Sequence, residues 1–425
     1  VLLCNSRSTV SRPLYKEESR DYFIDYELFD QWQWLSDNRF IVLSEKSGWR
    51  AAYLYSAQGI QQKQLTPDGT DLTAIYAFDE STQTLYYQAA ATPQTRQGYM
   101  LSLKKGTPVR LTDGEGTHDL FFSDNYRQMI DNYRSVSQPN TYTLYTLSKD
   151  GSKRKVKVLE DNADVAKDWA ALSIPEKTFF SFTTERGDLL NGWLLLPKDF
   201  DKTKKYPVLM IQYSGPQSQR VLDLWHKRWE YYLAHEGYIV ACVDGRGTDC
   251  RGRAFRNASY MQLGQVEAQD QISAARYLQS LPYVNADRLC LCGWSYGGFQ
   301  TLTTMSRPDS PFRCGIAIAP VTDWRLYDSA YTERYMRRPQ VNESGYNLSN
   351  LTDKGDRLNG KLLIVHGLAD DNVHAQNTLL YIESLVQANK QFDMQIYPDD
   401  NHFLKKRNNY THLHRRLMLF LQNNL

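Results

Sequence analysis

The stretch Gly293-Trp294-Ser295-Tyr296-Gly297-Gly298 follows an apolar run at residues 288–292 and precedes a segment with helical character. A G-x-S-x-G sequence between a buried strand and a helix is typical of a nucleophile elbow. In this turn the serine takes strained backbone angles and its neighbours must be small. We therefore predict that Ser295 is a nucleophile. The Tyr296 N–H, at the start of the following helix, is predicted to donate to a developing oxyanion.

The residues around this stretch alternate between strand-sized apolar runs and helical segments. Strands are predicted at residues 208–213, 238–243, 288–292, 315–319, 362–365 and 395–397. A helix predicted at residues 265–279 carries Ala268, Ile272, Ala275 and Leu278 on one face. Buried strands interleaved with amphipathic helices indicate a mostly parallel sheet covered on both faces. With the elbow, this predicts a doubly wound α/β-hydrolase fold for residues 174–425.

A serine nucleophile needs a base that is held in one orientation. In this fold the acid and the base follow the nucleophile, on loops after later strands. His402 follows the last predicted strand, and Asp370 and Asp371 follow the strand before it. We predict His402 as the general base, while spacing alone leaves both aspartates open as the carboxylate that orients it. His366, which directly follows its strand, is expected to turn the chain or to pack.

Two further segments stand where contacts with a substrate are expected. Tyr213 ends the first predicted strand, and the loop that begins there is the natural source of a second oxyanion donor. An aromatic residue can also simply end a strand. The run from Val321 to Tyr331 places Trp324, Tyr327 and Tyr331 just beyond the strand after the elbow. Aromatic clusters usually belong to the core, but this position favours a substrate pocket.

Residues 1–173 have a different pattern, with short alternating runs bounded by Gly, Pro, Asp and Asn. Similar turn sequences recur, for example at Leu65 and Leu111, which are 46 residues apart. A period of roughly 45 residues built from short strands is typical of a β-propeller blade, and a β-sandwich is the alternative. Three units would not close a ring. We therefore predict the C-terminal blades of an incomplete propeller, and we expect the gene to begin upstream of Val1.

The composition of the 425 residues excludes some classes of protein. Hydrophobic residues make up 41%, and the net charge is +2 without a long basic run. A packed core is therefore expected, and no nucleic-acid partner. No apolar run approaches the ~18 residues that span a bilayer. Cys290 and Cys292 share one face of a predicted strand, where we expect buried apolar side chains rather than metal ligands. No metal and no cofactor are expected.

Together these motifs resemble the prolyl oligopeptidase clan, and most closely its dipeptidyl peptidase IV branch. The resemblance rests on Gly293–Gly298, Asp244-Gly245-Arg246-Gly247, His366-Gly367, Asp370-Asp371-Asn372-Val373 and Tyr331-Thr332-Glu333-Arg334-Tyr335. It is close from residue 174 onward and loose in the β-repeats. It implies an eight-bladed propeller and a serine exopeptidase that removes X-Pro or X-Ala dipeptides from free peptide N-termini.

The resemblance also implies roles for single residues. It selects Asp370 as the acid, makes the Tyr213 hydroxyl an oxyanion donor, and gives Asn372 a hydrogen bond to the substrate carbonyl. The implied proline pocket consists of Tyr296, Val321, Trp324, Tyr327, Tyr331 and Val373. A flat aromatic slot suits the rigid pyrrolidine ring, which has no N–H to satisfy.

The family binds the substrate amine with a glutamate pair in an earlier blade, which finds no match here. Glu17-Glu18 is the only adjacent glutamate pair in the chain, and we interpret it as a solvated turn because charge clusters usually face water. Family members often dimerise through the C-terminal helix region, where Leu417, Phe420 and Leu421 would allow a homodimer. The resemblance also favours a periplasmic or secreted location.

Two alternatives share the predicted fold. A prolyl oligopeptidase or a tripeptidyl peptidase would use the same triad with a different amine clamp. A binding protein on the same fold would have lost the chemistry. The presence of Ser295, Asp370 and His402 together argues against the second alternative, because drift would have removed at least one of them.

Overall fold

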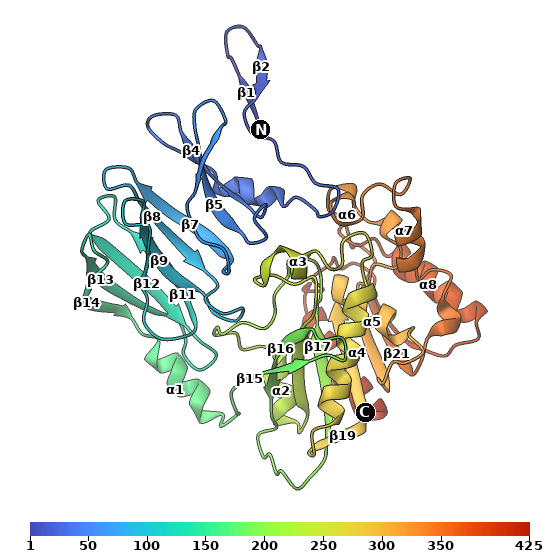
Figure 1. The fold of residues 1–425 in the computed structure, drawn as a ribbon. Coiled ribbons are helices and arrows are strands. Elements are labelled where there is room, and N and C mark those ends of the chain that lie inside the picture. Colours follow the sequence, from blue (N-terminus) through green and yellow to red (C-terminus); the bar gives the residue numbers. More distant parts are fainter. The chain divides into compact units, whose positions relative to one another are not determined.

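The computed structural model describes residues 1–425, which form two compact units (Figure 1). The first unit comprises Val1–Ala171, Leu222–His226 and Asp249–Arg256. The second comprises Leu172–Val221, Lys227–Thr248 and Asn257–Leu425. Two short segments of the predicted hydrolase part thus belong to the first unit. We retain the division between residues 173 and 174 as a prediction of the domain boundary.

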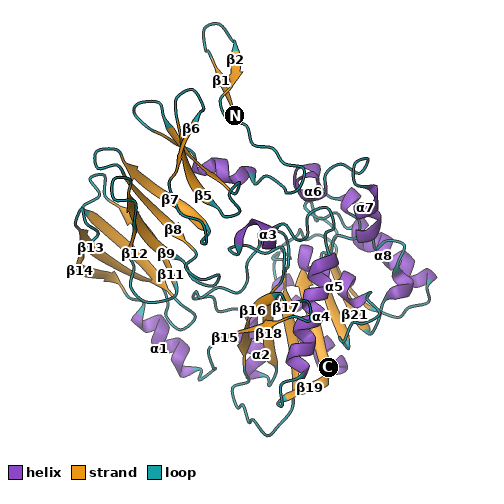
Figure 2. Ribbon diagram, in the orientation of Figure 1, coloured by secondary structure: helices purple, strands orange, loops and turns teal.

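The first unit is built from antiparallel sheets (Figure 2). Three sheets have four strands each: β3 (Gln33–Trp34), β4 (Phe40–Ser44), β5 (Ala51–Tyr55) and β6 (Gln61–Gln64); β7 (Leu72–Asp79), β8 (Thr84–Ala89), β9 (Gln97–Ser102) and β10 (Pro108–Arg110); β11 (Thr117–Phe122), β12 (Gln128–Arg134), β13 (Thr141–Leu147) and β14 (Lys153–Glu160). Each sheet holds only strands that are consecutive in the chain. The predicted four-stranded repeats are confirmed.

Apolar side chains on facing sides of neighbouring sheets form the core of this unit. Ile41 and Leu54 of the first sheet belong to one buried cluster with Leu85 of the second. Tyr86 of the second sheet shares another cluster with Met129 of the third. Buried apolar side chains therefore join each sheet to the next one along the chain.

Smaller elements complete the first unit: β1 (Leu2–Cys4), β2 (Ser11–Pro13), the 3-10 helix η1 (Tyr26–Gln31), α1 (Ala163–Ala171) and α3 (Gly252–Arg256). Sequence patterns did not indicate α1. None of its residues is buried, although Val165 and Trp169 lie on one face of the helix.

The structure corrects the interpretation of Glu17-Glu18 as a solvated turn. Glu18 is exposed and pairs with Lys16 at 2.8 Å. Glu17 is instead half-buried and accepts hydrogen bonds from the Ser44 hydroxyl at 2.9 Å and from the Tyr15 hydroxyl. The Glu17 carboxylate thus has two hydroxyl donors, one of them on β4, and the local charge pattern did not reveal them.

A buried network of charges joins the segment Asp249–Arg256 to the first sheets of this unit. The Arg50 guanidinium donates two hydrogen bonds to the Asp249 carboxylate, both of 3.1 Å. The Arg256 side chain, 1% exposed, pairs with both Glu45 and Asp249. Because buried charges are costly unless they are paired, these contacts make the segment an integral part of the unit.

The second unit contains one sheet of eight strands, covered by helices (Figure 1). In spatial order the strands are β15 (Thr178–Thr183), β16 (Leu189–Leu195), β18 (Ile239–Asp244), β17 (Tyr206–Gln212), β19 (Val284–Trp294), β20 (Cys314–Ile318), β21 (Lys361–Gly367) and β22 (Asp393–Tyr397). The pairings from β18 to β22 are parallel, and β15 and β16 are antiparallel. The predicted α/β-hydrolase class is confirmed.

The helices of this unit are α2 (Trp229–His235), α4 (Gln265–Gln279), α5 (Tyr296–Met305), α6 (Ser329–Met336), α7 (Glu343–Ser349), α8 (Gln376–Gln387) and α9 (Asn409–Asn424), with short 3-10 turns η2 (Trp324–Leu326) and η3 (Gly355–Arg357). Cys290 and Cys292 lie buried in β19, as expected for apolar side chains.

The register of the parallel strands positions the site. Gly367, at the end of β21, pairs with Tyr397 at the end of β22. The last residues of β19 pair with the end of β20, Trp294 with Ile318. The loops that follow these strands therefore all leave from the same edge of the sheet, where α/β proteins place their sites.

The C-terminal helix α9 corrects one expectation. Leu417, Phe420 and Leu421 are buried at 1%, 1% and 0% exposure inside the second unit, so they are not available to a second copy of the chain. The homodimer remains a prediction that needs other residues. Neither α9 nor any other helix combines the length and the apolar character that crossing a bilayer requires.

Candidate active site

The turn between β19 and α5 has the geometry of an elbow. Ser295 has φ 63° and ψ −119°, a strained conformation for a residue with a side chain. A Cβ atom at Gly293 would come within 2.1 Å of the Gly297 carbonyl oxygen, so only glycine fits there. The Ser295 N–H donates to the Ile318 carbonyl at 2.8 Å, which ties the turn to the neighbouring strand.

The predicted base and acid meet at the same edge of the sheet. His402 Nδ1 lies 2.7 Å from Asp370 Oδ2, and both side chains are buried. The other carboxylate oxygen of Asp370 accepts the backbone N–H groups of Asn372 and Val373, each at 2.9 Å. Asp371, the competing aspartate, is exposed. Asp370 is thus held on both oxygens, with one of them oriented toward the imidazole.

His366 contributes to the charge state of Asp370. Its Nε2 lies 3.3 Å from Asp370 Oδ2 and 2.8 Å from the Val373 carbonyl oxygen. Burial alone would raise the pKa of Asp370, but hydrogen bonds from His366 and His402 outweigh it and hold that pKa well below its usual range. Asp370 is therefore ionised at neutral pH, with one carboxylate oxygen facing His402 Nδ1.

Two residues near Ser295 carry the donors predicted for an oxyanion. Tyr296 is the first residue of α5, so its N–H has no carbonyl partner in the helix. Tyr213 lines the same cavity as Ser295. Burial raises the pKa of Tyr213 although the Arg220 guanidinium, 5.1 Å from its ring, and Ser295 both lower it. The phenol therefore keeps its proton and can donate it in a hydrogen bond.

Aromatic rings pack together beside the elbow and make up the predicted slot. Trp324 stacks on Tyr331 with ring centroids 5.9 Å apart, and Tyr327 meets Tyr331 edge-on at 5.4 Å. Tyr296 contacts Trp324 at 5.3 Å, which links the slot to the elbow. The Tyr327 hydroxyl donates to Asn372 Oδ1 at 2.7 Å. The remaining two predicted pocket residues, Val321 and Val373, are buried in the loops that follow β20 and β21.

A cavity of about 1190 Å³ opens over the Ser295 side chain. Ser295 and His402 both line it, although no hydrogen bond joins them, a common state in the absence of substrate. The Trp294 indole N–H donates to the His402 carbonyl at 3.0 Å and fixes the loop that carries the imidazole. The cavity extends from there along the outer face of α9.

The comparisons with known proteins agree with this geometry. Residues 225–425 match the prolyl oligopeptidase family, and residues 1–140 match the dipeptidyl peptidase IV N-terminal region. The chain belongs to the dipeptidyl peptidase IV branch of the prolyl oligopeptidase family.

Relatives of this family resemble the chain along most of its length. It is 37% identical over 380 residues to a probable dipeptidyl-aminopeptidase B of Arthroderma gypseum, and 33% identical over 393 residues to a probable dipeptidyl peptidase 4 of Aspergillus flavus. These matches cover 88% and 90% of this chain but only 41% and 50% of the relatives. The crystal structure of Porphyromonas gingivalis dipeptidyl peptidase 4 superposes with a TM-score of 0.95 at 42% identity, covering all of this chain and 60% of that one.

One buried residue of this family member was missed by sequence reasoning. Glu267 of α4 accepts the Tyr296 hydroxyl at 2.7 Å, while its second carboxylate oxygen has no partner. Burial raises the pKa of Glu267 to about 7. A signal was present, because Glu267 and Gln271 interrupt the apolar face of the helix that carries Ala268 and Ile272.

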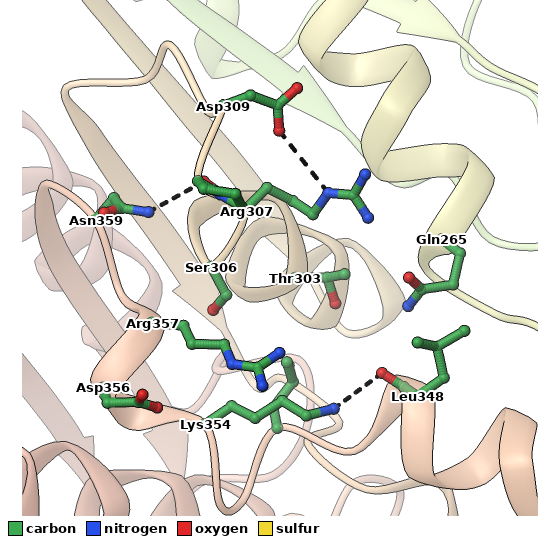
Figure 3. Close-up of a pocket in the computed structure, with 12 residues that line it drawn as sticks. Gln265, Thr303, Ser306, Arg307, Asp309, Leu348, Lys354, Asp356, Arg357 and Asn359 are labelled. Carbon is green, nitrogen blue, oxygen red and sulfur yellow. Dashed lines mark hydrogen bonds and ion pairs between the residues drawn. The ribbon is translucent and has the colours of Figure 1, made fainter.

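A second cavity, of about 540 Å³, lies at the far end of α5 and contains none of the predicted site residues (Figure 3). Its charged groups are largely engaged. Arg307 lies 3.9 Å from Asp309, and the Lys354 ammonium donates to the Leu348 carbonyl at 3.0 Å. It offers no nucleophile next to a base, so the chemistry of this family member is assigned to the first cavity.

Proposed function

We propose that the protein is a serine exopeptidase that releases X-Pro or X-Ala dipeptides from peptide N-termini. The observation that carries the proposal is the arrangement around the elbow. Ser295 stands on a strained turn and opens into the same cavity as His402, whose other ring nitrogen lies 2.7 Å from Asp370. Acyl transfer needs these three groups in this relation.

In the first half of the reaction, Ser295 Oγ attacks the carbonyl carbon of the second substrate residue. Its proton passes to Nε2 of His402, and the Asp370 carboxylate stabilises the imidazolium through Nδ1. The Tyr213 hydroxyl and the Tyr296 N–H donate to the oxyanion that forms. His402 then gives the proton to the leaving nitrogen as the C–N bond breaks, which leaves an ester on Ser295.

In the second half, a water molecule replaces the leaving peptide. His402 accepts a proton from the water as its oxygen attacks the ester, and the same two donors stabilise the second oxyanion. The proton returns to Ser295 Oγ when the C–O bond breaks, and the dipeptide leaves with a free carboxyl group. Asp370 remains ionised throughout, because its pKa lies far below that of an imidazole.

The aromatic slot accounts for the preference at the second residue. Trp324, Tyr327 and Tyr331 present flat faces and no unpaired charge, which fits a pyrrolidine ring and accommodates an alanine methyl. Asn372 faces the slot from the loop that also holds Asp370, with Tyr327 fixing its amide. We assign it to the carbonyl of the first substrate residue.

The activity is a proposal for the whole protein, because the chain spans about half the length of the curated relatives it matches. The printed names of those relatives, dipeptidyl peptidase and dipeptidyl-aminopeptidase, support release of dipeptides over tripeptides or internal cleavage. No separate feature of the structure favours either of those other cleavage modes.

Mapping of the products tests the proposal. The protein expressed from its full gene is incubated with a proline-containing peptide, and the fragments are identified by mass spectrometry. Release of the first two residues, abolished by acetylation of the peptide N-terminus, is the expected result. Release of tripeptides, or unchanged cleavage of the acetylated peptide, would contradict it.

A further inference from the structure

The direction in which the leaving peptide departs follows from the position of the base. His402 must deliver its proton to the leaving nitrogen, so the leaving peptide has to lie beside the imidazole. The slot of Trp324, Tyr327 and Tyr331 takes the acyl part of the substrate. The other part of the cavity, which runs past His402 and Phe403 to the first turns of α9, therefore receives the leaving peptide.

The charges in this part of the cavity are of one sign. Four cationic side chains line it, namely Arg220, Arg228, Lys405 and Arg415, and none of them forms an ion pair or a side-chain hydrogen bond. Lys227 is a fifth, but it pairs with Glu176. No aspartate or glutamate lines the cavity.

A charged face that serves only solubility usually mixes both signs, and its cations find carboxylates nearby. The neighbours of two of these cations behave in that way. Lys406, next to Lys405, pairs with Asp399, and Arg416, next to Arg415, pairs with Asp393 at 2.7 Å. Lys405 and Arg415, which face the cavity, are left unpaired.

We propose that this part of the cavity binds a carboxylate on the leaving peptide, so that the enzyme prefers substrates with an anionic group just after the scissile bond. The proposal rests on the proposed function and adds the class of leaving group to it. The carboxylate is either the side chain of an acidic residue at the third or fourth substrate position, or the C-terminal carboxylate of a tripeptide or tetrapeptide.

The size of the preference follows from the exposure of the cations. All four are exposed, and exposed ion pairs are individually weak. Two or three of them acting on one carboxylate in a recessed cavity give a preference of about 5- to 20-fold in kcat/KM at low ionic strength. Added salt weakens it, because the charges are accessible to counter-ions.

The test uses competition between peptides in one reaction with the protein expressed from its full gene. In the first arm, amidated Ala-Pro-Xaa-Ala-Ala peptides carry Glu, Gln or Lys at the third position, and a second set carries them at the fourth. In the second arm, Ala-Pro-Ala with a free C-terminus competes with its amide. A preference for Glu in the first arm, or for the free acid in the second, supports the proposal and identifies the carboxylate.

Two double variants locate the preference. The double variant Lys405→Gln with Arg415→Gln should lower the anionic preference about 3-fold or more. The matched control, Lys406→Gln with Arg416→Gln, removes the same charge one residue along and should leave the preference unchanged. If the first variant does not fold, loss of the wild-type preference on raising the NaCl concentration replaces it as the measurement.

Two results would overturn the inference. One is equal cleavage of all peptides in both arms at low ionic strength. The other is a preference that both double variants lower equally, since the net charge alone would then account for it. Failure of the proposed function is a separate result, because the Gln peptide would then release no Ala-Pro dipeptide at all.

Discussion

On one side of Ser295 lies a slot of Trp324, Tyr327 and Tyr331, and on the other lies a cavity lined by unpaired cations such as Lys405 and Arg415. The proposed function has the slot make contacts through ring faces and exclude charge, so that it selects by shape. The charges of the cavity are open to water, so under the second proposal the cavity selects anionic leaving peptides by electrostatic attraction. Under the two proposals, one nucleophile serves two selection rules that depend differently on salt and on side-chain volume.

The largest expected effect is on the nucleophile that both sides share. Ser295→Ala should lower kcat for every peptide by about 10⁴-fold or more, because triad members act as a unit. Labelling with a fluorophosphonate should disappear together with activity, while Ser306→Ala, at the other end of α5, keeps both. Labelling that survives in Ser295→Ala would place the chemistry elsewhere.

The buried carboxyl group of Glu267 contacts Tyr296 beside the slot, and we expect it to affect the stability of the protein. Glu267 keeps its proton up to about pH 7 in the folded protein, whereas the unfolded chain releases it near pH 4.5. The unfolded state therefore binds fewer protons between these values, and stability falls as pH rises from about 4.5 to 7, by up to about 3 kcal/mol. The contribution is fully present below pH 4.5.

The variant Glu267→Gln should remove this dependence, because the amide still accepts the Tyr296 hydroxyl and does not titrate. The measurement is Tm against pH from 5 to 7.5 for both proteins. We expect the variant to lose less stability than the wild type over this range. Parallel curves would mean that Glu267 is ionised in the folded protein.

A smaller effect is expected on the slot itself. Tyr327→Ala should lower kcat/KM for proline at the second position by ~10-fold or more, by opening the slot to water and releasing Asn372. Tyr327→Phe keeps the ring and removes only the 2.7 Å hydrogen bond to Asn372, so its loss should be smaller. An unchanged ratio between proline and a bulky residue at this position would remove Tyr327 from the pocket.

The smallest expected effect is a difference in how the substrate preferences of the two sides respond to salt. Raising the NaCl concentration from about 0.05 M to about 0.5 M shortens the screening length several-fold. The preference for anionic leaving peptides should fall a few-fold, while the preference for proline over alanine at the second position stays the same. A parallel decline of both preferences would mean that the salt acts on the fold rather than on either side of Ser295.

Sequence patterns predicted the parts of this site that depend on local geometry. The elbow at Ser295 was recognisable because its glycines and its flanking strand and helix are contiguous in the chain. Asp370 and His402 were recognisable because both follow buried strands. Spacing alone left Asp371 as a competitor, and the structure separates the two by the side chain that meets the imidazole.

The parts that were missed depend on packing between distant segments. Glu267 meets Tyr296 across two helices, and no local pattern reveals that pair. The cations of the cavity come from the loop before α2 and, about 180 residues later, from α9 and the segment leading into it, so their common sign was not visible in either part. Leu417 and Phe420 were assigned to a surface because an apolar stripe does not say which partner covers it.

The buried charge network of the first unit has a consequence for how the protein is made. Glu45 leaves the ribosome 211 residues before Arg256, which at ~5–20 residues per second is about 10 to 40 s. Until then the Glu45 carboxylate has only Arg50, 3.8 Å away, as an ionic partner, and burying it with that one contact would be unfavourable. The first unit therefore completes its packing only after the segment Asp249–Arg256, encoded within the hydrolase part, has been synthesised.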